Sequence, residues 1–306
     1  RESGCLTSTT RILRSDTNVE VEMGELLASG ERDIPVWTLD DDWRLVEGTM
    51  SHVFPSGTKQ TFRLRLASGR EVEATANHPF RTLDGWRALG DLDVGDRIAT
   101  PRAVATPDHI APMDVDELVL LAHLLGDGCV LPRQPIHYTN ADPANLDTVE
   151  EAAIRRFGCV PRRVAQDNHW HLYLPTEERL ARGRRNPISV WWDEFGLHDT
   201  RSHQKFIPNR VFALPSEQVA LFLRHLWATD GSLTIGPLRG LEAVRIYYAS
   251  SIRRLIEGVR SLLLRCGVVS EHKPEQIVRA LDALLEADEE AGIVLFMKTL
   301  SDGFQP

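Results

Sequence analysis

The feature that most constrains the fold is an apolar segment that occurs twice and ends both times in an Asp-Gly step. The copies span residues 118–128 and 221–231, and their aspartates are Asp127 and Asp230. Apolar residues at helical spacing predict a buried helix in each copy. Small residues near each end would let two helix backbones pack closely. The pattern therefore predicts that the two carboxylates lie side by side.

Two adjacent carboxylates repel each other unless a cation lies between them. Mg²⁺ accepts carboxylate, carbonyl and water oxygens as ligands, and it can activate water beside a phosphate. A single Asp-Gly step is more typical of an ordinary helix end with a capping glycine. Two copies, 103 residues apart, favour a metal site formed by Asp127 and Asp230.

Charge is distributed unevenly along the chain. The 306 residues carry a net charge of −9, yet residues 153–270 hold 18 basic and 10 acidic side chains. A basic region can dock a phosphate backbone, whereas the rest of the chain is acidic. Nucleic acid, if it binds, is expected on this region.

Residues 5–102 have the pattern of an all-β module. Short β-branched or alternating segments are separated by turn signals such as Pro55-Ser56-Gly57 and Ser68-Gly69. A linker is expected over residues 103–113. The strands expected here include residues 36–39, 61–66 and 71–74.

Residues 114–270 have the pattern of a mixed α+β domain. Helices are expected after Asp114 and Pro215 and over Ile252–Cys266, with strands at 169–174 and 244–248. Residues 271–306 form an acidic tail without an assigned role. In that tail we expect a helix over 274–285 and an apolar stretch at 293–297.

The doubled helices resemble those of the LAGLIDADG (DOD-type) homing endonucleases. Two further segments carry the resemblance: Lys205-Phe206-Ile207-Pro208, and Tyr247 to Ser251 leading into a helix that ends at Gly267. It implies a domain of two pseudo-repeats with Mg²⁺-dependent, site-specific double-strand DNA cleavage. By resemblance, Asp127 and Asp230 bind the metal and Lys205 is a cation near the scissile phosphate. The alternative for Lys205 is a solvated surface charge.

The β module resembles the Hint fold of inteins, which commonly carry such endonucleases. Cys5 follows Gly4 directly, and Thr75-Ala76-Asn77-His78 is similar to the Thr-x-x-His intein block. A Cys5 thiol can attack the Gly4 carbonyl in an N-to-S acyl shift. His78 could protonate the departing nitrogen, and Thr75 could hydrogen-bond the scissile peptide. No cofactor is expected for this step.

The first four residues, Arg-Glu-Ser-Gly, resemble a segment of DnaB-type replicative helicases. The resemblance implies an N-extein remnant at 1–4, an intein of the mycobacterial or actinobacterial type, and a flanking helicase as partner. The last asparagine is Asn209, so no His-Asn ending is present. Full splicing is therefore not expected from this sequence, and the acyl shift with slow N-terminal cleavage is expected only if the module folds without the missing C-terminal strands.

Three alternatives remain open from the sequence. A degenerate endonuclease would bind DNA without cutting it, and a Hint-like autoprocessing domain would have no DNA role. A histidine metal hydrolase is disfavoured, because His169-x-His171 lacks a matching ligand cluster. With 42% apolar and 26% charged residues, scattered cysteines and no long apolar run, we expect a cytoplasmic, monomeric, globular protein without membrane partners. The DNA recognition sequence cannot be read from the chain.

Overall fold

The computed structural model describes residues 4–176, 184–238, 241–272 and 293–297. The chain divides into two compact units, Arg1–Ile110 and Ala111–Pro306. The division falls inside the stretch that the sequence suggested as a linker. Each unit is described by itself.

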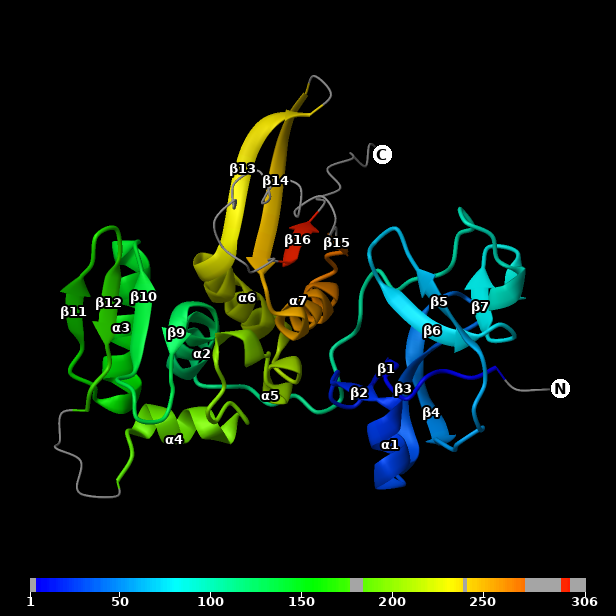
Figure 1. The fold of residues 1–306 in the computed structure, drawn as a ribbon, viewed down its shortest axis with the longest axis horizontal. Coiled ribbons are helices and arrows are strands. Elements are labelled where there is room, and N and C mark those ends of the chain that lie inside the picture. Colours follow the sequence, from blue (N-terminus) through cyan, green and yellow to red (C-terminus); the bar gives the residue numbers. More distant parts are fainter. Residues whose placement is uncertain (1–3, 177–183, 239–240, 273–292, 298–306) are drawn as a thin grey trace. The chain divides into compact units, whose positions relative to one another are not determined.

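The first unit consists mainly of antiparallel hairpins (Figure 1). Turn residues with positive φ join two of them, since Gly69 (φ 77°) precedes β6 and Gly85 (φ 121°) opens β8. The predicted strands at 36–39 and 71–74 lie within β3 and β6, and the one at 61–66 matches β5 apart from its last residue. The pairs are β1 (Arg11–Leu13) with β2 (Glu20–Glu22), β3 (Arg32–Leu39) with β4 (Leu45–His52), β5 (Thr61–Arg65) with β6 (Glu71–Thr75), and β7 (Pro79–Thr82) with β8 (Gly85–Ala88).

A short helix, α1 (Met23–Ser29), interrupts the β structure and was not expected. Glu22 and Glu25 form a capping box at its start, and Gly30 ends it in the left-handed conformation (φ 67°). A single 3₁₀ turn, η1 (Leu89–Asp91), follows β8. The module is therefore β with one local helical exception.

The N-terminal segment runs beside β6. The Thr75 N–H donates to the Cys5 carbonyl at 3.0 Å, and Leu6 bridges Ala74 in antiparallel sense. This pairing fixes Cys5 next to the end of β6, where the Thr-x-x-His block begins.

The second unit contains two four-stranded antiparallel sheets with the same internal order. The first sheet runs β9-β10-β12-β11 and the second runs β13-β14-β16-β15. In both, the first two strands in the chain pair with each other and the fourth lies between the second and the third. The strands are β9 (Gly128–Cys129), β10 (His137–Asn140), β11 (Arg162–Ala165), β12 (Trp170–Tyr173), β13 (Gly231–Leu238), β14 (Leu241–Ser250), β15 (Ser270–His272) and β16 (Ile293–Met297).

Helices precede corresponding strands of the two sheets, so each repeat reads helix, two strands, helix, two strands (Figure 1). This order agrees with the expected two-repeat α+β architecture. The repeat helices are α2 (Val115–Asp127) with α3 (Pro143–Phe157), and α6 (Ser216–Asp230) with α7 (Arg253–Arg265); α4 (Pro187–Glu194), η2 (Ser202–Gln204) and α5 (Asn209–Phe212) connect them.

Several elements of this unit were not foreseen, among them α3 and β16. Helix α3 begins at an Asp142 cap followed by Pro143 and ends at Gly158 (φ 60°), although its sequence has few large apolar residues. Strand β16 pairs with β14 and β15, so Ile293–Met297 belongs to the second sheet although the sequence placed it in a tail. The helix expected over 274–285 lies outside the described residues.

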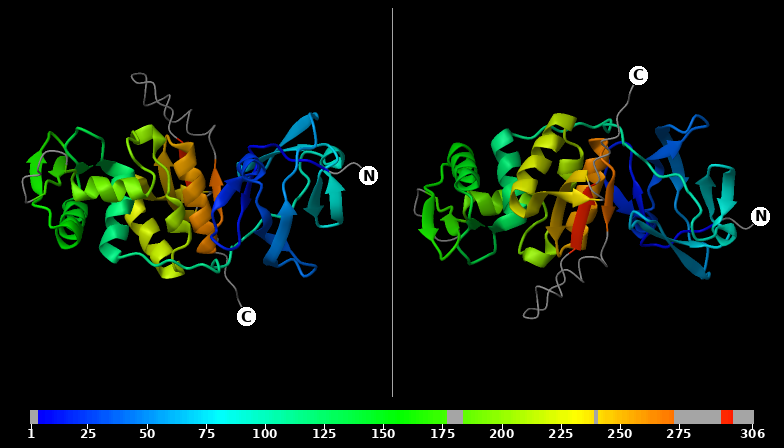
Figure 2. Two further views of the ribbon diagram at one scale, coloured as in Figure 1. Left: turned by 90° about the horizontal axis from the view of Figure 1, so that it is seen from below. Right: turned by 90° about the horizontal axis from the view of Figure 1, so that it is seen from above.

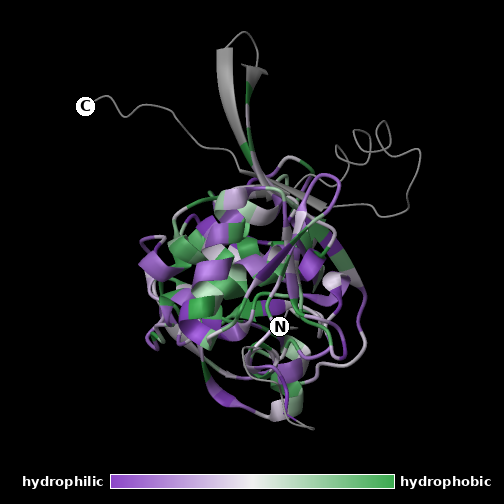
Figure 3. Cartoon of the chain, turned by 90° about the vertical axis from the view of Figure 1, so that its left-hand side faces the viewer, coloured by the Kyte–Doolittle hydropathy of each residue, from purple (hydrophilic) through white to green (hydrophobic). Residues whose placement is uncertain are grey.

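The core of the second unit lies where α2 and α6 pack side by side (Figure 2). Figure 3 colours the chain by hydropathy, with hydrophobic residues green and hydrophilic ones purple, and the sequences of both helices contain residues of each kind. Their closest approach is at Gly126, where an added Cβ would lie 2.1 Å from Thr229 Oγ1. Among the described residues, no helix has the length and apolar character needed to cross a membrane.

Candidate functional sites

Helix α2 ends at Asp127 and α6 ends at Asp230, and a glycine follows each aspartate. Gly128 and Gly231 are extended (φ −92° and −84°), not left-handed. A Cβ at Gly128 would lie 2.5 Å from Leu124 Cα, and one at Gly231 would lie 2.3 Å from the Trp227 carbonyl oxygen. The glycines thus allow the backbone to turn sharply from helix into strand at both places, which leaves each aspartate at the end of its helix.

The two carboxylates lie near each other, with Asp127 half-buried and Asp230 exposed by surface area. Burial, and then the charge of Asp230, raise the pKa of Asp127 to about 6, whereas a hydrogen bond from Asn140 (2.9 Å) opposes the rise. Burial also raises the pKa of Asp230, although that residue keeps an exposed edge. The Tyr248 hydroxyl donates to Asp230 Oδ2 at 3.4 Å. A divalent cation would relieve this repulsion.

The donor set fits a hard cation only in part. The described residues hold no group of three or more His, Cys, Asp or Glu side chains able to bind a metal. Further ligands beside the two aspartates would therefore come from backbone carbonyls, water or a phosphate, all of which Mg²⁺ accepts.

Lys205 lies between η2 and α5, and its side chain is buried, with only 4% of the residue exposed. Its ammonium group donates to the carbonyls of Leu124 (2.9 Å), Gly126 (3.2 Å) and Gly128 (2.7 Å). Burial lowers the pKa of Lys205 to about 8, while nearby Asp127 opposes that shift. The geometry excludes the solvated surface charge that the sequence left open.

A histidine pair crosses the interface between α2 and α6. His123 and His225 are joined by a 3.1 Å hydrogen bond between Nε2 and Nδ1, and His123 Nδ1 lies 3.0 Å from the Tyr138 hydroxyl. His123 is fully buried. No pattern in the sequence pairs His123 with His225, which lies 102 residues further along the chain.

The residues around Cys5 form a second candidate site, in the first unit. The Cys5 N–H donates to Thr75 Oγ1 at 2.9 Å, and this hydroxyl donates in turn to Asn77 Oδ1 at 2.7 Å. Thr75 therefore holds the Gly4–Cys5 amide by accepting a hydrogen bond from its N–H. Burial lowers the pKa of His78, and a hydrogen bond with the Gly4 backbone partly offsets that shift.

Gly4 approaches His78 closely, because a Cβ at Gly4 would lie 2.5 Å from His78 Cα. Two residues that the sequence analysis missed complete the site. Ser56 Oγ lies 3.1 Å from Cys5 Sγ, and Lys59 Nζ lies 3.6 Å from the same sulfur. In the sequence, the only signal near these two residues was the turn at Pro55-Ser56-Gly57.

Comparison with known proteins then addresses the second unit. A family model described as a LAGLIDADG-like domain matches residues 217–281. The chain carries a LAGLIDADG-like domain. The matched residues include α6, Asp230, β13, β14 and α7, which form the second repeat.

The LAGLIDADG-like chain is also similar to the replicative DNA helicase DnaB of Synechocystis sp., with 38% identity over 271 residues, 88% of this chain and 31% of the helicase. The chain thus spans about a third of that relative's length. A crystal structure of the Ssp DnaB mini-intein variant M86 is similar at 36% identity and TM-score 0.32, covering 33% of this chain and 67% of that one. I-DmoI in complex with DNA and Mn is similar at 13% identity and TM-score 0.38, covering 60% and 91%.

The resemblance to DnaB-type inteins with a LAGLIDADG domain is confirmed. The mycobacterial or actinobacterial type stays a prediction. So do the individual roles of Cys5, Thr75, His78, Asp127 and Asp230.

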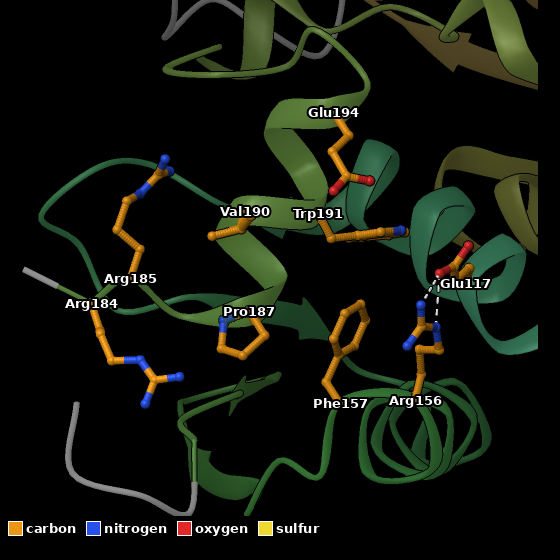
Figure 4. A pocket seen from close by; sticks show the side chains of 9 residues that line it. All are labelled: Glu117, Arg156, Phe157, Arg184, Arg185, Pro187, Val190, Trp191 and Glu194. Atoms are coloured by element: carbon orange, nitrogen blue, oxygen red, sulfur yellow. Dashed lines mark hydrogen bonds and ion pairs between the residues drawn. The ribbon is translucent and has the colours of Figure 1, made fainter. Parts of the chain in front are cut away.

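A pocket of about 550 Å³ lies between α3 and α4 of the LAGLIDADG-containing unit (Figure 4). Glu117 and Arg156 form an ion pair at one side, and the Trp191 side chain of α4 points toward that pair. Glu117 is ten residues from Asp127, or roughly 15 Å along α2. The pocket is therefore no part of the aspartate site. Its lining residues are Glu117, Arg156, Phe157, Arg184, Arg185, Pro187, Val190, Trp191 and Glu194.

Proposed function

We propose that this chain is an intein of a DnaB-type replicative helicase, with two activities. The first is an N-to-S acyl shift at Gly4-Cys5, and the second is Mg²⁺-dependent, site-specific double-strand DNA cleavage. The packing of α2 on α6, which brings Asp127 and Asp230 to one place, carries the nuclease proposal. The substrate is the host gene without the intein, and the protein acts as a cytoplasmic monomer beside its helicase extein.

In the nuclease, the chain holds two carboxylates in fixed positions. Asn140 orients Asp127, and Tyr248 orients Asp230. A bound Mg²⁺ would supply Lewis-acid activation of a phosphate and of water. The rigid ends of two packed helices set the spacing of the two acids, which a reaction with in-line geometry requires.

In the acyl shift, the Cys5 thiol gives its proton to solvent, from which His78 is recharged, and the sulfur attacks the Gly4 carbonyl carbon. The carbon–sulfur bond forms, the Gly4–Cys5 carbon–nitrogen bond breaks, and the nitrogen gains a proton that we assign to His78. The Lys59 ammonium and the Ser56 hydroxyl favour the thiolate by charge and hydrogen bonding. Thr75 holds the amide whose bond breaks.

The nuclease proposal is tested with a plasmid that carries the uninterrupted helicase coding sequence. Incubation with Mg²⁺ should yield a linear product, and a chelator should prevent it. A protein that shifts the same DNA in a gel but never nicks it would support the degenerate DNA-binding alternative instead.

The acyl shift is tested with the full chain behind a longer N-terminal extein. A thiol such as dithiothreitol should release the extein at Gly4, and mass spectrometry should locate the cut. Cys5→Ala should abolish release. Release from the Cys5→Ala variant would show that the thiol is not the nucleophile.

A further inference from the structure

The C-terminal end of α2 has an unusual set of hydrogen-bond partners. The last carbonyls of a helix have no partner within the helix and need one from elsewhere. Here one side chain, Lys205, serves the carbonyls of Leu124, Gly126 and Gly128 at 2.7–3.2 Å. An ammonium group has three protons, so each carbonyl receives one and none remains for another acceptor.

Lys205 is delivered to this position by a well-packed segment. Ile207 is buried and lies against α7, where a Cβ at Gly258 would be 3.1 Å from Ile207 Cδ1. Arg254 of α7 stacks over the Phe206 ring at 4.0 Å. Packing against the second repeat thereby fixes Lys205, whose ammonium group binds the C-terminal end of α2 in the first repeat.

The corresponding end of α6 is held differently. Its Ala228 carbonyl accepts from the Asn145 amide at 3.0 Å, and its Leu226 carbonyl accepts from Thr229 Oγ1 at 2.6 Å. Neither donor is charged. Among the described residues, the ends of the two helices are therefore held by different kinds of donor, and a lysine side chain caps only the α2 end, at Asp127.

We propose that Lys205 is a positioning residue, which locks the junction of α2 and β9 and so places Asp127, instead of donating to the scissile phosphate. This inference rests on the proposed nuclease function. Donation to a phosphate would require the ammonium to leave at least one of these three carbonyls, of which the Leu124 carbonyl is buried and the other two are part-buried. The Lys205 charge also lowers the pKa of both Asp127 and Asp230, so it offsets the repulsion between them before any metal binds.

The first arm of the test needs no activity. In the full, metal-free chain, Lys205→Met keeps the apolar stem and removes the donors. Amide hydrogen exchange over residues 126–130 should become about tenfold faster, because the junction opens locally. Arg210→Met, which removes an exposed cation five residues away, should leave that exchange unchanged. Wild-type exchange in a folded Lys205→Met variant would overturn the inference.

The second arm separates positioning from phosphate contact. For Lys205→Met, the Mg²⁺ concentration for half-maximal cleavage should rise about tenfold, with DNA affinity in Ca²⁺ unchanged. Slower cleavage or weaker DNA binding at the wild-type Mg²⁺ requirement would instead support a phosphate contact and overturn the inference.

If Lys205→Met fails to fold, Lys205→Arg serves as the second variant. It keeps the charge, but a planar guanidinium cannot direct three donors as an ammonium does. It should fold, exchange faster than wild type over 126–130 and need more Mg²⁺. Wild-type behaviour of Lys205→Arg in both measurements would contradict positioning by the ammonium tripod. If the wild-type chain does not cleave, the nuclease proposal fails, and the exchange arm still decides the role of Lys205.

Discussion

At the scale of single residues, His123 shows how burial sets chemistry. Burial, and then the charge of His225, lower the pKa of His123 to about 3. The residue is therefore neutral in the folded unit at pH 7, where its two nitrogens serve Tyr138 and His225. Protonation would place a charge inside the interface between α2 and α6.

This residue predicts acid sensitivity of the second unit. The unfolded chain binds a proton at His123 below pH 6.5, whereas the folded chain does so only near pH 3. The contribution of His123 to the free energy of unfolding is therefore fully present above pH 6.5, and it is lost as the pH falls towards 3. Between pH 7 and pH 5 the free energy of unfolding should drop by about 2 kcal/mol from this group.

Denaturant unfolding at both pH values checks this expectation. His123→Gln, which keeps hydrogen-bonding atoms but does not titrate, should lack the loss of about 2 kcal/mol that His123 contributes, while groups such as Asp127, whose pKa burial raises to about 6, contribute equally in both proteins. The exposed His203→Gln should keep that loss. Equal pH dependence in wild type and His123→Gln would contradict the assignment.

A second residue-scale prediction concerns Lys59. Lys59→Met should slow thiol-induced release of the N-extein about twofold to fivefold, since an exposed charge contact contributes at most about 1 kcal/mol. Lys59→Arg should restore most of the rate, and Arg97→Met, which removes an exposed charge elsewhere in the unit, should not change it. Release assays on gels give these rates, and an unchanged rate in Lys59→Met would remove Lys59 from the site.

At the scale of elements, the sequence predicted those helices and strands whose signal lies in a local pattern of residues. Helices α2, α6 and α7 carry apolar residues at helical spacing, so their signal is contained within each segment. Helix α3 was missed because half of its buried residues are the small Ala152 and Ala153. Strand β16 was missed because its partners are distant in the chain. Ser56 and Lys59 reach Cys5 across more than 50 residues, a separation that no local pattern reveals.

The contact between α2 and α6 gives an element-scale prediction. Gly126→Ala would place a Cβ 2.1 Å from Thr229 Oγ1 and 2.4 Å from Thr229 Cβ, so the helices must separate. The unit should lose about 1–3 kcal/mol of unfolding free energy, as overpacked cores do. Thr229→Gly in the same chain should recover part of that loss. Additive losses in the double variant would show that the two residues do not meet.

At the scale of the whole molecule, net charge is a poor guide to DNA binding. The basic region of residues 153–270 has 18 cations, but several are paired within the described structure. Arg155 pairs with Asp116, Arg156 with Glu117, and Arg163 with Asp147 and Glu150. Fewer than 18 cations are therefore available to contact DNA phosphates.

The salt dependence of DNA binding should reflect this reduced number. Measured in Ca²⁺ to prevent cleavage, the logarithm of the binding constant should fall against log salt with a slope of about −4 to −9, as for roughly five to ten phosphate contacts. Fluorescence anisotropy with a labelled duplex gives the slope. A slope near zero would contradict docking of this region on the DNA backbone.

The central claim is that Asp127 and Asp230 together bind the Mg²⁺ on which DNA cleavage depends. The most direct measurement is the single-turnover cleavage rate of Asp127→Asn and Asp230→Asn in Mg²⁺, with the exposed Asp167→Asn as the matched control. Each active-site variant should remain folded and bind the duplex, yet cleave at least about 1,000-fold more slowly, because one metal ligand contributes several kcal/mol at the transition state. The control should cleave at the wild-type rate. Wild-type cleavage by either Asp127→Asn or Asp230→Asn would contradict the account.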